Sequence, residues 1–139
     1  MAVHILTNAG LLVNAVDLSA YLVRVALAYE ADVVDVSAMA ATPVKNYKVG
    51  ATGWTMEVEF FQDYAASKVD ATLFPLVGAA AFAIILKSTN TTESSTNPHF
   101  TGNAFLKSYG GPVSGNFNAD HKISASFIGD GALTRDVTP

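Results

Sequence analysis

The pattern of apolar and polar residues changes period within one central stretch, residues 54–78. Its first eight residues alternate, with Trp54, Met56, Val58 and Phe60 on one side and Thr55, Glu57, Glu59 and Phe61 on the other. Such alternation is typical of a strand with one buried face. From Ser67 onward, apolar residues recur every three to four positions, as they do in an amphipathic helix. The stretch therefore predicts a strand that leads into a helix at about residues 67–77.

Local signals mark both ends of this predicted helix. Ser67 with Asp70 three positions later resembles a capping box, with Asp in place of Glu, that would satisfy free amides at the helix start. Gly78 is well placed to end the helix, because a residue without Cβ adopts a left-handed conformation at little cost. Pro75 predicts that the last turn is distorted or ends early.

Most of the remaining chain reads as strands. Further strands are predicted at residues 3–6, 11–14, 21–30, 81–87, 100–109, 113–118 and 121–128. In the strand at 21–30, the face bearing Val23, Val25 and Leu27 is expected in the core. Residues 129–131 are expected to end the last strand. Seven or eight strands with a single helix predict a mainly β fold, a β-sandwich or β-barrel with one flanking helix.

Two long segments are predicted to lie outside this core. Residues 32–49 have small apolar residues, weak periodicity and a break at Thr42-Pro43. They are expected to form a long, partly extended excursion, and such loops usually bind a partner or move. Residues 88–99 are polar throughout and are expected to form an exposed loop, to which the sequence assigns no role.

Composition indicates that the chain buries apolar surface against something else. At 139 residues it is most simply one domain, yet half of its residues are hydrophobic, 14% are charged, and the mean hydropathy is +0.31. A membrane or other protein subunits could cover the surplus. The uncharged run 71–86 is shorter than the roughly 18 to 20 residues needed to span a bilayer, and Pro75 and Gly78 interrupt it. Other subunits are therefore the expected partners, and a membrane is not.

The sequence offers no combination of residues that predicts catalysis or a cofactor. It lacks cysteine, and its three histidines are far apart, so we interpret them as surface histidines in turns and expect no metal. The net charge of −4 and the scattered basic residues argue against specific nucleic-acid binding. Glu57 and Glu59 share one strand face, as paired acid–base carboxylates sometimes do, but such pairs are ordinary on the exposed face of an amphipathic strand, and we interpret them as a solvated face. No enzymatic activity is expected.

The central stretch also resembles a known family. The run from Gly53 to Gly78 is similar to the central signature of tail tube proteins, the major tail proteins of long-tailed, non-contractile bacteriophages. In that family a tryptophan strand and a Gln-Asp-aromatic turn lead into a helix of Val-Asp-Ala-Thr-Leu type. Supporting motifs occur in the same order along the chain as in the family. They are residues 17–19 before the strand at 21–30, residues 97–98 before the strand at 100–109, and residues 129–131 near the end. The resemblance covers roughly residues 17–134, and its motifs are structural.

The resemblance implies a structural virion protein. Six β-sandwich-like subunits would close into a ring, and stacked rings would form the hollow tail tube through which DNA passes into the host. The implied partners are other copies of the chain, the tail terminator, distal tail proteins, the tape-measure protein in the lumen, and genomic DNA in transit without specific binding. Assembly would take place in the host cytoplasm. Alternatives are a secretion-system tube protein, a tail terminator, or, from a different class, a small carboxylate-based enzyme or binding domain.

The implied assembly gives two sets of candidate residues. The lumen is expected to be acidic or neutral, and it would be faced by Glu57 and Glu59 or, as an alternative, by Lys122, Ser124 and Ser126. Inter-subunit arms are implied for the amino-terminal segment 1–16 and for the loop 32–49. The loop residues expected at the interface are Val33, Val34, Val36, Met39, Pro43 and Tyr47.

Overall fold

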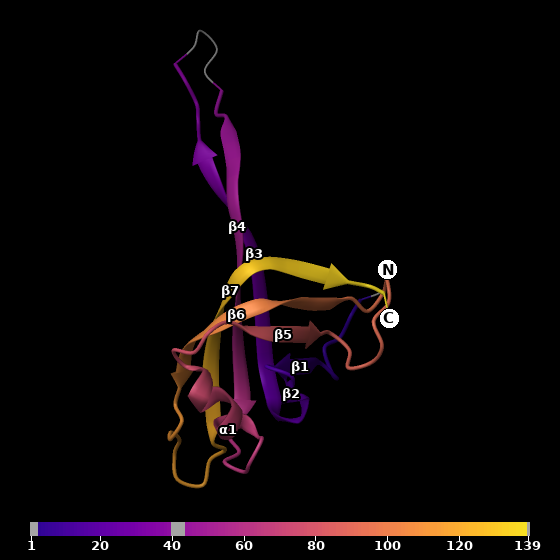
Figure 1. The fold of residues 1–139 in the computed structure, drawn as a ribbon, viewed down its shortest axis with the longest axis vertical. Helices are drawn as coiled ribbons and strands as arrows, with labels where there is room; N and C mark the ends of the chain where they lie inside the picture. Colours follow the sequence, from indigo (N-terminus) through magenta and orange to yellow (C-terminus); the bar gives the residue numbers. More distant parts are fainter. Residues whose placement is uncertain (1–2, 40–43, 139) are drawn as a thin grey trace.

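The computed structural model describes residues 3–39 and 44–138, and within them seven strands form one antiparallel sheet (Figure 1). The strands are β1 (Gly10–Val13), β2 (Val16–Asp17), β3 (Leu22–Asp35), β4 (Tyr47–Phe61), β5 (Phe82–Lys87), β6 (His99–Gly110) and β7 (Lys122–Asp136). Their order across the sheet is β2-β1-β5-β6-β7-β4-β3. One α-helix, α1 (Val69–Leu73), continues into the 3-10 helix Phe74–Leu76, and a second 3-10 helix covers Ser19–Tyr21. The predicted fold class, mainly β with one helix, is confirmed.

The sheet folds over because β6 and β7 are long enough to belong to both of its halves. β6 pairs with β5 from His99 to Ala104 and with β7 along nearly its whole length. Register shifts in the β6–β7 pair, after Thr101 and after Leu106, accompany the bend. In Figure 1, β3 and β4 run along the long axis of the molecule, while β5 and the nearby parts of β6 and β7 run across it. The two halves thereby enclose one core.

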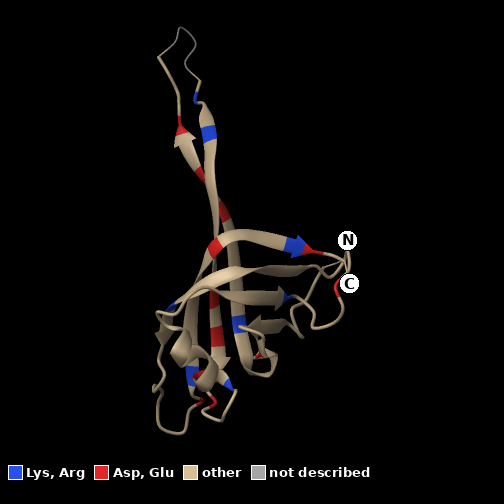
Figure 2. Cartoon of the chain, viewed as in Figure 1, with Lys and Arg blue, Asp and Glu red and all other residues tan. Residues whose placement is uncertain are grey.

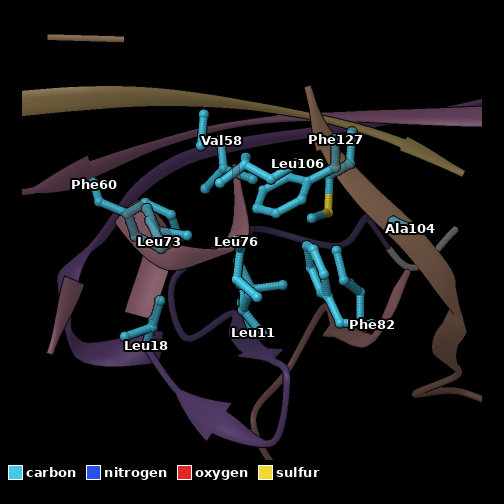
Figure 3. Packing of buried hydrophobic residues seen from close by; sticks show 14 of the residues in the cluster. Leu11, Leu18, Val58, Phe60, Leu73, Leu76, Phe82, Ala104, Leu106 and Phe127 are labelled. Atoms are coloured by element: carbon cyan, nitrogen blue, oxygen red, sulfur yellow. The ribbon is translucent and has the colours of Figure 1, made fainter. Parts of the chain in front are cut away.

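The core lies on the inner face of the folded sheet (Figure 3). β4 contributes Trp54, Met56, Val58 and Phe60, as the alternation predicts, and β7 contributes Ile123, Ala125 and Phe127. β1, β5 and β6 supply the opposite wall with Leu11, Val13, Phe82, Ile84, Leu86, Ala104 and Leu106. The helical segment closes one end by burying Val69, Leu73 and Leu76.

The predicted capping box is wrong. Ser67 has a positive φ of 60° and lies outside α1, and Lys68 occupies the N-cap without a side-chain hydrogen bond. Asp63 organises the start of the helix instead. Its carbonyl accepts the backbone N–H of Asp70 at 3.1 Å, and its carboxylate accepts the backbone N–H of Ala65 at 2.9 Å. A preceding turn therefore replaces the local cap.

The end of the helical segment agrees with the prediction. Pro75 lies in the 3-10 turn that follows α1, where its missing N–H costs little. Gly78 has φ of 79°, the left-handed conformation expected for a residue that ends a helix.

Several predicted strands differ from the structure. Residues 3–6 and 113–118 are not strands, and the latter lie in the loop between β6 and β7. The last strand does not end at residues 129–131. β7 passes through Gly129 and Gly131 and continues to pair with β6, with Thr134 opposite Thr101. On β3 the expected core face is only partly buried. Val25 and Leu27 pack against the core, while Val23 is exposed.

Candidate assembly surfaces

Two of the strand edges that the sheet leaves open among the described residues belong to β3 and β6. β3 spans 14 residues and pairs only with β4 among the described residues. β6 also has an open edge, because β5 accompanies it only as far as Ala104. Beyond that point, from Phe105 to Gly110, the side of β6 away from β7 carries a single bridge, between Leu106 and Val77. Open edges present backbone N–H and C=O groups that can pair with another chain.

The two alternative sets of lumen residues lie together on one surface. Glu57 is directly opposite Ser126, and Glu59 is directly opposite Ser124, in the β4–β7 register. Directly opposite residues of antiparallel strands share a face, so one surface contains both sets. We call Glu57, Glu59, Lys122, Ser124 and Ser126 the polar face. It lies on the side of the sheet opposite the core.

The polar face continues onto the neighbouring strands and carries both signs of charge. Arg24 on β3 is opposite Glu59, and Lys107 on β6 lines a shallow depression together with Glu57. With Lys122, three cations accompany the two carboxylates. The salt bridges found among residues 3–39 and 44–138 include none of these five side chains. The surface is therefore close to neutral rather than a wall of carboxylates.

The predicted excursion at residues 32–49 is a projecting β-hairpin. β3 and β4 continue past the body of the molecule, with Val33 opposite Val49 and Asp35 opposite Tyr47 (Figure 1). Five of the six predicted interface residues are exposed, by 44% to 98%, namely Val33, Val34, Val36, Met39 and Tyr47. Pro43 lies outside the described residues. The hairpin thus carries exposed apolar side chains well away from the core.

The amino-terminal segment 1–16 divides into two parts. Residues 3–9 are not in a strand, and Val3, Ile5 and Leu6 are exposed. Leu11 and Val13, by contrast, are fully buried in the core. The part of this segment that is free to reach another subunit is therefore shorter than predicted.

A hydrogen-bond network anchors the segment around α1 to the sheet. The hydroxyl of Tyr21 donates to Asp63 Oδ2 at 2.7 Å. The hydroxyl of Tyr109 donates to Asp70 Oδ1 at 2.8 Å and accepts from Gln62 Nε2 at 2.7 Å. The sequence does not indicate this network, because its members are about 40 residues apart and the Gln-Asp pair indicates only a turn.

Loss of the Tyr109 hydroxyl is expected to destabilise the fold. Burial raises the pKa of Tyr109 to about 12, and the neighbouring Asp70 carboxylate also raises it, so the phenol remains protonated and able to donate. Tyr109→Phe removes two hydrogen bonds at once, and we expect a loss of about 1–2 kcal/mol in unfolding free energy. Urea denaturation measures this loss. Tyr29→Phe is the control, because the exposed Tyr29 hydroxyl makes no hydrogen bond to the described residues; equal losses in both variants would contradict the role of the network.

The contact between Tyr21 and Asp63 is expected to depend on pH. Hydrogen bonding from Tyr21 is the main cause that lowers the pKa of Asp63 below its ordinary value of 3.8. A lowered carboxyl pKa contributes stability above the ordinary value, and this contribution is lost as the pH falls through the lowered pKa. Tyr21→Phe should therefore destabilise the protein most near neutral pH, with a difference that shrinks below about pH 4.

Carboxyl NMR titration of Asp63 provides the direct measurement for this prediction. In the Tyr21→Phe variant the pKa of Asp63 should move up toward 3.8. An unchanged titration of Asp63 in that variant would show that the Tyr21 hydroxyl is not the group that lowers its pKa.

His99 is buried, contrary to the prediction, and its ring contacts the Thr91 carbonyl at 3.0 Å and Glu93 at 3.5 Å. Among residues 3–39 and 44–138, no group of three or more acidic or histidine side chains could hold a metal ion. Within the same part of the chain, no helix is both long and apolar enough to cross a membrane.

Comparison with known proteins shows a shared fold without detectable sequence similarity. Neither a protein-family model nor a characterised protein matches the sequence. A chain in the virion of a native gene transfer agent (GTA) particle is similar in structure, with a TM-score of 0.71, 12% identity, and coverage of 93% of this chain and 95% of that chain. A chain in the tail of an empty GTA particle, refined with helical C6 symmetry, gives a TM-score of 0.63 at 14% identity, covering 84% and 82% of the two chains. The fold is therefore that of components of such particles.

Proposed function

We propose that this chain is the structural subunit of a tail tube and has no enzymatic role. Six copies would form a ring, and stacked rings would form a hollow tube that conducts DNA from the particle into the host. The observation that carries this proposal is the similarity of fold to a chain of a GTA virion over 93% of the described protein's length. The C6 symmetry of the similar GTA tail supports the number of copies.

The open strand edges supply a route to ring closure. The free edge of β3 in one copy would pair with the free edge of β6, Phe105–Gly110, in the next. Four strands of each copy, in the order β6-β7-β4-β3, would then form the wall of a continuous barrel. Closure would remove the unpaired edges of β3 and of Phe105–Gly110 that an isolated subunit leaves exposed.

The polar face is the surface of this wall that is free to line the lumen. The other face packs against β1, β5 and α1 and buries the core (Figure 3). Serine hydroxyls with nearly balanced charges would give a moving duplex few phosphate contacts to hold it. Glu57, Glu59, Lys122, Ser124 and Ser126 are thus assigned to the lumen in this proposal.

The proposed assembly has further partners. A tape-measure protein would occupy the lumen, a tail terminator and distal tail proteins would cap the two ends, and genomic DNA would pass without specific binding. The subunits would assemble in the host cytoplasm and reside in the tail of the virion. The projecting hairpin and the amino-terminal residues 3–9 are the parts available to join one ring to the next.

Negative-stain microscopy of the purified protein tests the proposal. Rings or tubes of uniform diameter are the expected result, and a mass measurement on single rings should give six copies. Single rings that never extend would favour a tail terminator. A strictly monomeric protein at high concentration would contradict the assembly.

A further inference from the structure

An apolar groove lies between β3 and the neighbouring ends of β5, β6 and β7. Its volume is about 520 Å3, and the strands line it with the apolar side chains of Val25, Leu27, Tyr29, Leu86, Phe100 and Leu133. Its polar lining residues are Lys87, Ser88 and Arg135, and the two cations occupy the ends of β5 and β7 (Figure 2). Of the apolar side chains from the strands, only Leu86 is buried. The groove is thus a largely uncovered continuation of the core.

The amino-terminal residues 3–9 run beside this groove and beside the free edge of β3. Leu6 lines the groove. Residues 6–9 also share a second depression, of about 220 Å3, with residues 22–25 at the beginning of β3. Consecutive residues of a strand point to opposite faces, and both Arg24 and Val25 line this depression, so it follows the edge of β3 and not one face. We call residues 3–9 the amino-terminal strap.

The strap is anchored at one end. The carbonyl of Asn8 accepts a hydrogen bond from the backbone N–H of Asn90 at 2.7 Å, which ties the end of the strap to the body of the molecule. Within residues 3–39 and 44–138, no backbone hydrogen bond joins residues 3–7 to β3. The strap therefore lies next to an open strand edge without closing it.

The strap is apolar on both of its sides, and so is the edge of β3. In an extended strap, Ile5 and Leu6 point in opposite directions. With Leu6 in the groove, Ile5 would face Ala26 and Ala28 on the other side of β3. Val3, Ile5 and Leu6 are all more than half exposed, so closing the strap along the edge would remove apolar surface from water.

We propose that the amino-terminal strap caps the edge of β3 in the unassembled subunit, with Leu6 in the groove, and that a neighbouring copy must displace the strap to close the ring. The inference rests on the proposed ring closure through β3, for which it names the control. A covered edge keeps free subunits from pairing prematurely. Ordering the strap costs backbone entropy that offsets much of the gain from its three apolar side chains, so a neighbour can displace it.

A disulfide between the strap and β3 tests the cap directly, because the chain contains no cysteine of its own. Leu6 and Val25 line both depressions, so they are the pair to link. Oxidation of dilute Leu6→Cys/Val25→Cys protein should give a monomer with an internal disulfide that does not form rings. Reduction of the same sample should restore the rings. Mass spectrometry and negative-stain microscopy, each with and without reductant, measure both results.

The matched control moves one cysteine by a single position along β3. Ala26 follows Val25 in the strand, and it lies on the opposite face of the sheet, across from Glu57. Leu6→Cys/Ala26→Cys protein should form its internal disulfide about tenfold more slowly, because the two Cβ atoms cannot point toward each other. Equal rates in the two variants would show that the strap has no fixed place beside β3 and would overturn the cap.

Polar substitutions in the strap give a second, independent readout. In the Ile5→Ser/Leu6→Ser variant, the protein concentration at which rings appear should fall by about tenfold, because apparent affinity scales with the fraction of subunits whose edge is open. Damage to the subunit would raise that concentration instead. His4→Ser is the control, since it keeps the apolar residues of the strap, and it should assemble like the wild type. Mass photometry counts the rings. An unchanged or higher concentration for Ile5→Ser/Leu6→Ser would contradict the cap.

The failures of the two proposals can be told apart. If the wild type forms rings and the oxidised Leu6→Cys/Val25→Cys protein also forms them, or never forms its internal disulfide, the cap is overturned while the tube stands. Disulfides between two subunits in place of internal ones would put the strap on another copy and would also overturn the cap. If neither the wild type nor the Ile5→Ser/Leu6→Ser variant forms rings, the tube and the role of the cap in its assembly fall together.

Discussion

Lysine substitutions on the free edge of β3 are expected to abolish ring formation while the monomer stays folded. The variant carries Ala26→Lys and Ala28→Lys, at positions on β3 that lie outside the core. Lysines on an edge strand oppose pairing with another chain, because pairing would bring their charges into a crowded interface and restrict their side chains. Circular dichroism should show unchanged strand content, and light scattering should show a mass of one subunit where the wild type shows rings.

The matched control adds the same charge to the same face but away from the edge. Thr55→Lys with Ser124→Lys places two lysines on β4 and β7, which are both paired on either side within the subunit. This control should still form rings. Loss of rings in both variants would mean that charge on the polar face, and not the β3 edge, governs assembly. Rings in both would contradict closure through β3.

Gly129→Ala is expected to cause the largest loss of stability from a single added methyl group. A Cβ at residue 129 would collide with the indole atoms Nε1, Cδ1 and Cε2 of Trp54. Trp54 is buried, and its ring is also close to Gly102 on β6, where an added Cβ would lie 2.9 Å from Cζ2. The ring therefore has little room to move, and relief requires the strands to shift. Overpacking of this kind costs about 1–3 kcal/mol.

Thermal and urea denaturation of Gly129→Ala and Gly53→Ala measure this effect. Gly53 is the control, because a Cβ there would meet nothing within 4 Å. Gly53→Ala should leave the unfolding free energy almost unchanged, whereas Gly129→Ala should lower it clearly. A small effect at residue 129 would show that Trp54 can be accommodated elsewhere in the core.

The alternation of apolar and polar residues is sufficient to predict the central strand, β4. Each of the four residues predicted on the inner face of β4 is buried, because a strand with neighbours on both sides has one face in the core and one outside. The same reasoning was less accurate on β3. That strand lies at the edge of the sheet, where its inner face reaches the groove rather than the middle of the core, and a register shift follows Leu22.

Contacts between distant residues account for most of the errors. Glycine at 129 and 131 predicts a strand end, but Gly129 makes room for Trp54, which is 75 positions away in sequence. Asp63 is expected only in a turn, yet its carboxylate accepts a hydrogen bond from the hydroxyl of Tyr21, the last residue of the 3-10 helix before β3. His99 is buried because the loop at 88–99 folds over it. None of these partners leaves a periodic signal in the sequence.

The candidate lumen surface was predicted residue by residue but not as a unit. On the sequence alone, the carboxylates of β4 and the serines of β7 are alternatives, because strand order cannot be derived from alternation. The β4–β7 pairing unites them and brings Arg24 and Lys107 to the same surface. An electrostatic role for Glu57 and Glu59 must therefore be judged together with these cations.

A cryo-microscopy map of the assembled protein tests the central claim most directly. The predicted result is a sixfold wall in which β3 of each copy pairs with Phe105–Gly110 of its neighbour and the polar face lines the lumen. A map in which β3 remains unpaired, or in which the polar face points outward, would contradict the account.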